Sequence, residues 1–325
     1  MQVIIPLAGK GTRLRPHTHL VPKPLLKVAG RPVMDWVMDK LQGLQVSEII
    51  YITGHLKEQV EQYARARYPY PSRFIEQKVQ DGTAGAINLA RPHVTEPVLI
   101  IFVDTVFEAD LTLINRTTAD GIIWAKEVED YQRFGVVVTN PEGFMTRIIE
   151  KPSTPISKLA NIGLYYIKDT AALWRGIDHV LQSPANKGEF YLTDAFQHMI
   201  DHGRKILTAE VGGWYDCGKL DTLLETNETL LRQGHARRRE FPGVTIHDPV
   251  LIQDGVAIEQ SVIGPNVTLE AGARVVNSRL EHVIVGQKST VLDSTLHHSM
   301  LGDRVSVRGL KGTTTLGDDS EIDVR

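Results

Sequence analysis

Short runs of aliphatic and β-branched residues alternate with longer segments of helical period along the first two-thirds of the chain. The runs that predict buried strands are Val3 to Leu7, Glu48 to Ile52, Val98 to Val103 and Gly121 to Ala125. Between the first two, the spacings of three and four that form one face of a helix are occupied by Val33, Val37, Met38 and Leu41. This alternation is typical of strands joined by crossover helices, and it predicts an α/β domain with a parallel sheet covered by helices on both sides.

After about residue 240 the helical period disappears and six-residue units replace it. The aliphatic residues that recur six apart are Ile252 and Ile258; Ile263, Leu269 and Val275; Val285 and Val291; Leu301 and Val307. Such hexads close into a triangular coil whose aliphatic residues share a narrow core, so we expect a short parallel β-helix of roughly three coils. The register slips near Glu281 and His297. The glycines that follow an aliphatic residue, where we expect tight corners, are Gly264, Gly286 and Gly302.

Length and charge limit the classes of function. At about 150 residues per domain, the 325 residues indicate two domains, which we place at 1–235 and 236–325. Lys and Arg number 36 against 39 Asp and Glu, for a net charge of −3. A balance this close to neutral removes the diffuse attraction on which most nucleic-acid and membrane binders depend, so we expect neither partner. The linker arginines Arg237, Arg238 and Arg239 are interpreted as a solvated or interdomain face.

The single cysteine, Cys217, excludes an internal disulfide and a cysteine-based zinc site. The longest apolar run, Val98 to Val103, is far shorter than the roughly 20 residues that span a bilayer. The N-terminal sequence lacks a basic leader and a cleavage site. We therefore expect a cytoplasmic protein.

A glycine-rich turn follows the first predicted strand, in the sequence Leu7-Ala-Gly-Lys-Gly-Thr-Arg-Leu-Arg-Pro16. Gly9 and Gly11 allow backbone amides to approach an anion, and Arg13 and Lys23 can supply positive charge. A dinucleotide-binding fingerprint would need a third glycine at Leu14, and the Gly-Lys-Ser/Thr of a Walker loop is absent. The turn therefore predicts a phosphate site of another type.

The combined pattern G-x-G-T-R-L-x-P and P-K-P-L resembles the sugar-1-phosphate nucleotidylyltransferase family. The resemblance continues in family order to about residue 230 through Gln77 with Gly82-Thr83-Ala84, Val103-Asp104, Phe134-Gly135-Val136, Glu150-Lys151-Pro152, Asn161-Ile-Gly163, Gly188-Glu-Phe-Tyr-Leu-Thr-Asp194 and Trp214-Tyr-Asp-Cys-Gly218. Within the family the chain looks most like glucose-1-phosphate thymidylyltransferases with a β-helical tail. The resemblance implies a Rossmann-like catalytic domain with a mixed or parallel sheet, followed by a left-handed parallel β-helix.

The family reaction joins a nucleoside triphosphate to a sugar 1-phosphate and releases pyrophosphate. The second pKa of a phosphate monoester is near 6, so the sugar phosphate is already nucleophilic at neutral pH and needs no general base. Two polyanions must be aligned and the leaving pyrophosphate neutralised, which requires cations and a metal. The resemblance implies Mg²⁺ as cofactor, and the family's two metal ligands correspond to Asp104 and Asp216.

The resemblance also assigns roles to the remaining motif residues. The expected catalytic residues are Arg13, Lys23, Asp104 and Asp216, with Arg13 and Lys23 on the triphosphate. The expected nucleotide-binding residues are Leu7, Gly9, Gly11, Thr12, Arg13, Gln77, Gly82 and Thr83. The expected sugar-phosphate residues are Gly135, Glu150, Lys151, Asn161, Gly163 and Trp214, with Lys151 on the phosphate and Glu150 on a sugar hydroxyl or orienting Lys151.

Gln77 occupies the position at which the family reads the base. A carboxamide both donates and accepts, and so it matches the adjacent N3–H and carbonyl of a pyrimidine, whereas guanine favours a carboxylate. This favours dTTP or UTP with a hexose 1-phosphate, most simply glucose 1-phosphate. Mannose-1-phosphate guanylyltransferase and a catalytically silent nucleotide-sugar sensor remain as alternatives. An acyl-transfer activity of the short tail is disfavoured, and we expect the β-helix to mediate self-association into a homo-oligomer.

The twelve histidines show no metal-ligand spacing in the sequence. The two adjacent groups, His17 with His19 and His297 with His298, are interpreted as surface or turn residues.

Overall fold

The computed structural model describes residues 1–186 and 188–324. The chain forms two compact units, one of Met1–Gly9 and Val37–Trp214 and the other of Lys10–Trp36 and Tyr215–Arg325, here called the first and second units. The domain boundary predicted between residues 235 and 236 falls inside the second unit and stays a prediction. Within the described ranges, no helix is both long and apolar enough to cross a membrane.

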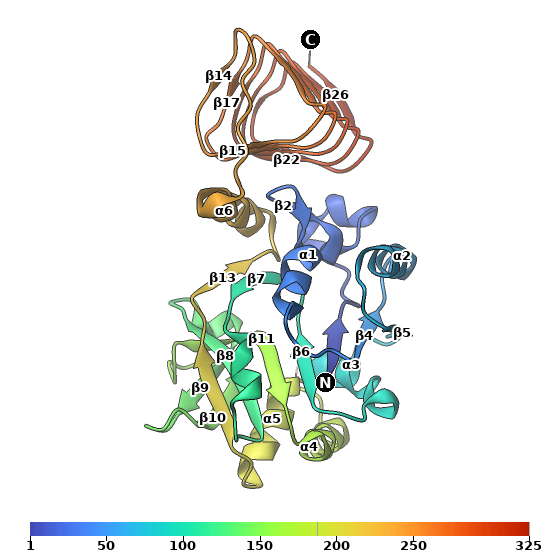
Figure 1. Ribbon diagram of the computed structural model, residues 1–325, viewed down its shortest axis with the longest axis vertical. Coiled ribbons are helices and arrows are strands. Elements are labelled where there is room, and N and C mark those ends of the chain that lie inside the picture. The colour runs from blue at the N-terminus through green and yellow to red at the C-terminus, as the bar shows by residue number, and fades with distance from the viewer. Residues whose placement is uncertain (187, 325) are drawn as a thin grey trace. The chain divides into compact units, whose positions relative to one another are not determined.

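The first unit is built on a mixed sheet, in which the described strands follow the order β10-β9-β11-β6-β1-β4-β5, with β8 beside β11 and β12 beside β8 (Figure 1). Strands β6, β1, β4 and β5 are parallel, while β11 is antiparallel to β6 and β10 to β9. The strands are β1 (Gln2–Pro6), β4 (Glu48–Thr53), β5 (Ser72–Glu76), β6 (Val98–Ile101), β8 (Gly121–Glu127), β9 (Gly135–Thr139), β10 (Met145–Glu150), β11 (Leu159–Ile167) and β12 (Ile206–Glu210), with the further short strands β7 (Thr105–Glu108) and β13 (Gly213–Asp216). The α/β expectation is confirmed, with parallel pairing from β6 through β1 and β4 to the edge strand β5, and between β8 and β12.

Helices bury one face of this sheet. Ile4, Ile50 and Ile100 share a core with apolar residues of α3, α4 and α5, and burying each such side chain contributes about 1.5–3 kcal/mol. Helix α4 begins where the carboxylate of Asp169 accepts a hydrogen bond from the N–H of Ala172 at 2.9 Å, which satisfies one free donor of the first turn. The helices are α1 (Val33–Met38), α2 (Lys57–Arg67), α3 (Thr83–Asn88), α4 (Thr170–Gln182) and α5 (Leu192–Asp201), with the 3-10 turns η4 (Asp39–Leu41), η5 (Arg91–His93), η6 (Leu111–Asn115) and η7 (Tyr131–Arg133).

The second unit contains the predicted β-helix, whose coils trace a triangle in Figure 1. Its strands are β14 (Thr245–Ile246), β15 (Val250–Ile252), β16 (Ala257–Glu259), β17 (Val262–Ile263), β18 (Val267–Leu269), β19 (Arg274–Val276), β20 (Arg279–Val285), β21 (Thr290–Leu292), β22 (Thr295–Leu301), β23 (Ser306–Arg308), β24 (Lys311–Gly312), β25 (Thr315–Leu316) and β26 (Glu321–Asp323). The same unit holds η1 (Thr12–Leu14), η2 (His17–His19), η3 (Lys23–Leu25), the hairpin β2 (Lys27–Val28) and β3 (Arg31–Pro32), α6 (Leu220–Leu230) and the π-helical turn η8 (Leu231–His235).

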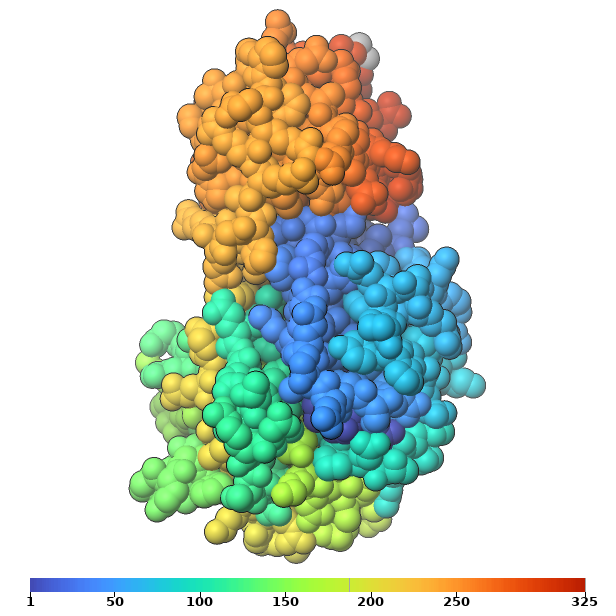
Figure 2. All heavy atoms as spheres, in the orientation of Figure 1, coloured from blue at the N-terminus to red at the C-terminus, as the bar shows by residue number. Residues whose placement is uncertain are grey.

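Columns of aliphatic side chains, one on each side, fill the interior of the triangle. The space between the ribbons in Figure 1 is therefore occupied by atoms in Figure 2. In one column Val275 pairs with Val291, and Val291 pairs with Val307, each sixteen residues on, while the spacing is seventeen from Ile258 to Val275 and fifteen from Val307 to Ile322. A coil of three full hexads would have about 18 residues, and the shortening occurs at the predicted slips. The sheet β16-β19-β21-β23-β26 has five rungs, more than the roughly three coils expected, and its last strand lies beyond Val307, the final residue of the predicted hexads.

Stacked serines satisfy the backbone at one corner of the coil. The hydroxyl of Ser278 donates to the carbonyl of Val276 at 2.7 Å and accepts from the N–H of Ser294 at 3.0 Å, and Ser294 repeats the pattern with Leu310 at 3.1 Å. Each hydroxyl thus pairs a donor and an acceptor from successive coils that would otherwise be buried unpaired.

Candidate functional site

The glycine-rich turn begins in the first unit and continues in the second. The N–H of Leu7 donates to the carbonyl of Ile52 at 2.7 Å, which fixes the end of β1, and a side chain at Gly9 would meet no atom within 4 Å. Gly11 has φ +60°, and a Cβ there would lie 3.0 Å from Cγ2 of Thr18 and 3.1 Å from Cβ of Lys23. Both its conformation and its close neighbours therefore require glycine.

Two predicted catalytic residues meet in the second unit. Oδ1 of Asp216 accepts a hydrogen bond from the N–H of Gly218 at 2.7 Å. A Cβ at Gly218 would lie 2.8 Å from that oxygen and 3.1 Å from Nη2 of Arg13. The turn η1, which contains Thr12 and Arg13, is thereby brought beside a carboxylate about 200 positions away.

The residues predicted to read the base lie together in the first unit. Gln77 is 8% exposed, and its Nε2 donates to Oδ1 of Asp81 at 3.2 Å. Gly82 has φ +117°, and a Cβ there would lie 2.4 Å from the carbonyl oxygen of Phe190. Sequence reasoning missed Asp81, which holds the carboxamide in place; its position directly before Gly82 was the available signal.

Thr83 joins this cluster to the segment Gly188–Asp194 by accepting a hydrogen bond from the N–H of Leu192 at 2.8 Å. The next residue, Thr193, donates from its hydroxyl to Oε2 of Glu150 at 3.2 Å. The quoted motif thus bridges the predicted nucleotide and sugar residues, and Thr193 is a site residue that the sequence analysis did not single out.

Four of the predicted sugar-phosphate residues converge. Nδ2 of Asn161 donates to the carbonyl of Gly135 at 2.8 Å, and its Oδ1 accepts from the N–H of Gly163 at 3.3 Å. The hydroxyl of Tyr165 donates to the same Oδ1. A Cβ at Gly135 would lie 2.3 Å from Nδ2 of Asn161 and 2.7 Å from Oε2 of Glu150, so a glycine is required for these side chains to come together.

Glu150 and Lys151 form a weakly paired site at the end of β10. Burial raises the pKa of Glu150, and the positive charge of Lys151 opposes the rise. Nζ of Lys151 lies 3.8 Å from Oε1 of Glu150 and 4.9 Å from the centre of the Tyr191 ring. The side chain of Lys151 is 42% exposed, which leaves its ammonium able to meet an anion.

Trp214 packs beside Phe134 with ring centres 4.8 Å apart. Phe134 in turn accepts at its carbonyl from the N–H of Lys151 at 2.9 Å. The indole N–H of Trp214 is buried and meets no acceptor among the described residues. The predicted sugar-phosphate residues of the first unit are therefore tied to one another from four separate strands.

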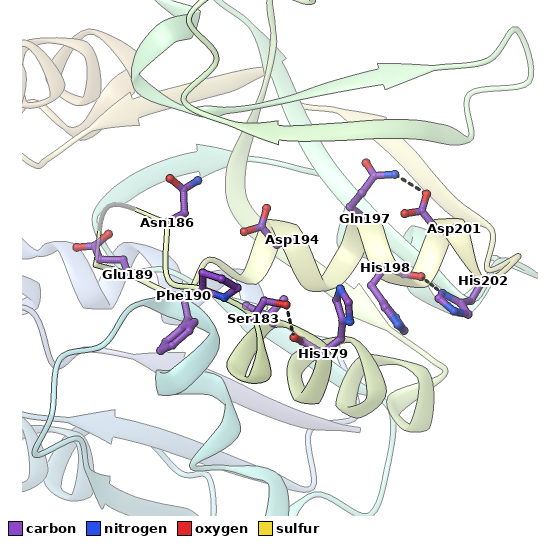
Figure 3. A pocket seen from close by; sticks show the side chains of 12 residues that line it. His179, Ser183, Asn186, Glu189, Phe190, Asp194, Gln197, His198, Asp201 and His202 are labelled. Carbon is purple, nitrogen blue, oxygen red and sulfur yellow. Dashed lines mark hydrogen bonds between the residues drawn. The ribbon is translucent and has the colours of Figure 1, made fainter.

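A cavity of about 610 Å³ is lined by residues of α4 and α5 and by residues between these helices, among them Phe190 (Figure 3). His179, His198 and His202 line it, with ring centres 4.8 Å and 4.0 Å apart in succession. Burial and the neighbouring imidazoles lower the pKa of His198. In residues 1–186 and 188–324, no three His, Cys, Asp or Glu side chains are arranged to hold a metal ion.

One histidine lies in a turn, as one of the two expectations had it, but not at the surface. His17 belongs to the 3-10 turn η2 and is 2% exposed, with its Nε2 2.9 Å from Oγ1 of Thr315 within the second unit. Burial lowers the pKa of His17 to about 4, so it is neutral at physiological pH. The other three histidines of these groups are exposed, as expected.

The predicted metal ligands belong to different units, Asp104 to the first and Asp216 to the second. A metal ion shared between them stays a prediction.

The comparisons with known proteins decide the family. The family model for the nucleotidyl transferase domain matches residues 2–233. The chain belongs to the nucleotidyl transferase family. The resemblance drawn from the motifs is thereby confirmed, and the matched range includes every predicted site residue of this nucleotidyl transferase.

Relatives with different printed activities align with this nucleotidyl transferase. Bifunctional protein GlmU of Methanococcus aeolicus is 32% identical over 80% of the chain, which spans 62% of that relative's length. UTP–glucose-1-phosphate uridylyltransferase AglF of Haloferax volcanii is 34% identical over 66% of this chain and 89% of its own. A glucose-1-phosphate thymidylyltransferase of Streptomyces antibioticus is 27% identical over 100% of both. The thymidylyltransferase therefore also aligns with the β-helix.

The fold is that of a solved UDP-glucose pyrophosphorylase, crystallised with UDP-glucose. It matches with a TM-score of 0.63 and 22% identity over 71% of this chain and 98% of that one.

Proposed function

We propose that the protein transfers a nucleotidyl group from a pyrimidine nucleoside triphosphate, dTTP or UTP, to a hexose 1-phosphate, glucose 1-phosphate being the first candidate. The observation that carries the proposal is the cluster of Gly135, Glu150, Asn161 and Thr193, which brings polar groups from distant strands around a glycine and next to the ammonium of Lys151. Family membership and the printed activities of the relatives support the same reaction.

Lys151 binds the sugar phosphate in this proposal, while Arg13 and Lys23 bind the triphosphate. The carboxylate of Glu150 accepts hydrogen bonds from the sugar hydroxyls, and the amide of Asn161 donates to them. The exposed side chain of Lys151 supplies positive charge without first breaking a tight ion pair. No general base is assigned, because a sugar phosphate is largely a dianion at neutral pH.

Asp104 and Asp216 would hold Mg²⁺. When bound, this ion would neutralise part of the negative charge of the phosphates. Both are half-buried carboxylates, the ligand type that a hard cation takes. Mg²⁺ is usually bound by one or two carboxylates and completes its shell with water and substrate phosphates, so a preformed cluster of three protein ligands is not needed. The carboxylate of each residue therefore suits the ion, and one Mg²⁺ shared by the two is part of the proposal.

Gln77 supports the assignment of a pyrimidine as the base of the nucleoside triphosphate. Its Nε2 is engaged by Asp81, which orients the carboxamide. The carboxylate of Asp81 is itself packed against Gly85, where a Cβ would lie within 2.5 Å of both of its oxygens, so it supports Gln77 and does not itself read the base. Because a carboxylate next to the base position is also what guanine recognition uses, GTP belongs in the test.

The proposal is tested by incubating the purified protein with Mg²⁺, each common nucleoside triphosphate and a panel of sugar 1-phosphates, and measuring pyrophosphate. Release with dTTP or UTP and glucose 1-phosphate is the expected result. Activity confined to GTP and mannose 1-phosphate would replace the base assignment, and no release with any pair would support the alternative of a silent sensor.

Gly135→Ala tests the sugar pocket. The new Cβ would displace the amide of Asn161 and the carboxylate of Glu150, so we expect the KM for the sugar 1-phosphate to rise by at least about tenfold, which is about 1.4 kcal/mol of binding. The KM for the nucleoside triphosphate serves as the internal control and should stay within about twofold. An equal rise in both KM values would show a general distortion and contradict the assignment.

A further inference from the structure

Residues 10–36, here called the signature segment, are attached to the β-helix at several points within the second unit. Nε2 of Gln253 donates to the carbonyl of Gly30 at 3.1 Å. Oδ1 of Asn227 accepts from the N–H of Ala29 at 2.9 Å and also from the hydroxyl of Thr268 at 2.8 Å. With the contact of His17 and Thr315, these bonds join the segment that contains Arg13 and Lys23 to coils far away in sequence.

The charged member of this set is the pair Lys27 and Glu270. Nζ of Lys27 lies 2.5 Å from Oε2 of Glu270 and 3.6 Å from Oδ1 of Asp303. The side chain of Glu270 is 2% exposed, and that of Lys27 is 24% exposed. A small cavity of about 70 Å³ adjoins the pair, and its apolar walls include Leu26 and Ile284.

Stability alone does not explain a buried ion pair in these surroundings. Taking two charges out of water costs several kcal/mol, and replacing such a pair by apolar residues of similar volume is often neutral or stabilising. Burial, with smaller contributions from the neighbouring carboxylates Asp303 and Asp318, raises the pKa of Glu270 to about 7 in spite of Lys27. What the pair does supply is one fixed position for Lys27 relative to the coil.

Lys27 is connected to Lys23 through a hydrogen-bonded turn. The turn η3 lies between them, with the N–H of Leu26 donating to the carbonyl of Lys23 at 3.2 Å. Pro22 and Pro24 fix the backbone torsions on either side of Lys23. A displacement of Lys27 is therefore transmitted to Lys23 instead of being absorbed.

Lys23 in turn borders the glycine turn. The space left by the missing side chain of Gly11 is closed by Lys23 and Thr18, and the hydroxyl of Thr18 donates to the carbonyl of Gly11 at 2.8 Å. A continuous set of contacts thus runs from Glu270 through Lys27 and Lys23 to the turn that is proposed to bind phosphate.

We propose that Glu270 of the β-helix is a positioning residue for nucleotidyl transfer: by fixing Lys27, it places Lys23 and the turn at Gly11 for the triphosphate. This inference rests on the proposed function and assigns the β-helix a part in the transfer site. Glu270 itself touches no substrate.

The proposal has a pH dependence with opposite signs for activity and stability. Protonation of Glu270 as the pH falls through about 7 removes its attraction for Lys27, so triphosphate binding weakens. A carboxyl whose pKa is raised by folding binds more protons in the folded state, so its contribution to the free energy of unfolding falls as the pH rises from 4.5 to about 7. Acid thus lowers activity while this group favours the fold.

The other charged groups facing Glu270 do not produce the same profile. His17 stays neutral in this range because burial lowers its pKa to about 4. Burial also raises the pKa of Asp318, whose Oδ2 lies 3.7 Å from Nη2 of Arg304. Asp303 contacts Lys27 at 3.6 Å and remains as a weaker partner when Glu270 is neutral.

Three variants test the proposal: Glu270→Gln, the double variant Lys27→Met with Glu270→Met, and Asp319→Asn as an exposed β-helix control. We measure KM and kcat for the triphosphate between pH 6 and 8.5, together with the melting temperature. Glu270→Gln should raise the KM at least about tenfold at pH 8 and remove the change in KM near pH 7. The double variant should melt at or above the wild-type temperature and keep the raised KM, while Asp319→Asn matches wild type.

A wild-type KM in Glu270→Gln, or its recovery in the double variant, would overturn the proposal. Hydrogen exchange of residues 10–26 provides a readout that needs no activity: we expect slow exchange in wild type and at least about tenfold faster exchange in both substituted proteins. Unchanged exchange would also overturn it. Absence of turnover in wild type would instead contradict the proposed function, and the exchange comparison would still decide whether Glu270 orders the segment.

Discussion

Asp104→Asn and Asp216→Asn are each expected to lower kcat by about 10³-fold, because losing one ligand of a phosphate-bridging metal removes several kcal/mol of charge stabilisation and each 1.36 kcal/mol is a factor of ten. Asparagine keeps an oxygen that can accept from the N–H of Gly218, the bond that Asp216 makes at 2.7 Å. The substitution therefore removes the charge and preserves the turn. The rate of pyrophosphate release at saturating substrates is the measurement.

Asp178→Asn is the matched control, since it removes an exposed carboxylate that pairs with Arg91 at the surface. It should retain the wild-type rate, and all three variants should melt within about 2 °C of the unsubstituted protein. Wild-type turnover in either Asp104→Asn or Asp216→Asn would contradict the two-carboxylate metal site. A large fall in melting temperature would indicate a structural role instead.

The central strands and the β-helix could be predicted from the sequence because their signals are local. Strands β1, β4, β6 and β8 lie within a few residues of the predicted runs, since each run is buried on both faces and therefore almost wholly apolar. The columns of the β-helix were readable because one aliphatic residue per side must point inward.

Strands β9, β10 and β11, on the antiparallel side of the sheet, could not be predicted in the same way. Strand β11 contains Gly163 at φ +75° and a register shift between Asn161 and Tyr165, both of which interrupt the alternation that marks a strand. The irregularity lies where Asn161 meets Gly135. The pattern thus failed where the chain departs from regular geometry to form the candidate site.

The motifs indicated most of the site residues but not the contacts that hold them. Gln77 was identified, whereas Asp81, which fixes its carboxamide, was marked only by its position directly before Gly82. Lys27 and Glu270 are 243 positions apart, and pairing at that separation leaves no trace in local sequence. The attachment of the signature segment to the β-helix could therefore not be predicted from the sequence.

Gly286→Ala is expected to lower the free energy of unfolding by about 2–3 kcal/mol, the usual cost of forcing extra atoms into a packed interior. The sequence suggested that this glycine serves a tight corner, but its φ is not positive, so backbone strain is not the reason for it. A Cβ at Gly286 would lie 2.3 Å from the carbonyl oxygen and 2.4 Å from the carbonyl carbon of Gly302, and no side-chain rotation relieves a clash with backbone.

A Cβ at Gly302 would lie 3.0 Å from the carbonyl carbon of Gly317. The three glycines Gly286, Gly302 and Gly317 therefore allow successive coils to approach one another. Replacing glycine by alanine at an unstrained position stabilises a protein by about 0.4–1 kcal/mol through the unfolded chain, which is smaller than the clash and leaves the net effect destabilising. Calorimetry should show a melting temperature lower by about 5–10 °C for Gly286→Ala. Gly212→Ala, whose Cβ would make ordinary contacts of 3.5 Å with Glu108, should melt within about 2 °C of wild type. Equal melting of the two variants would mean that the coils can separate freely at this column.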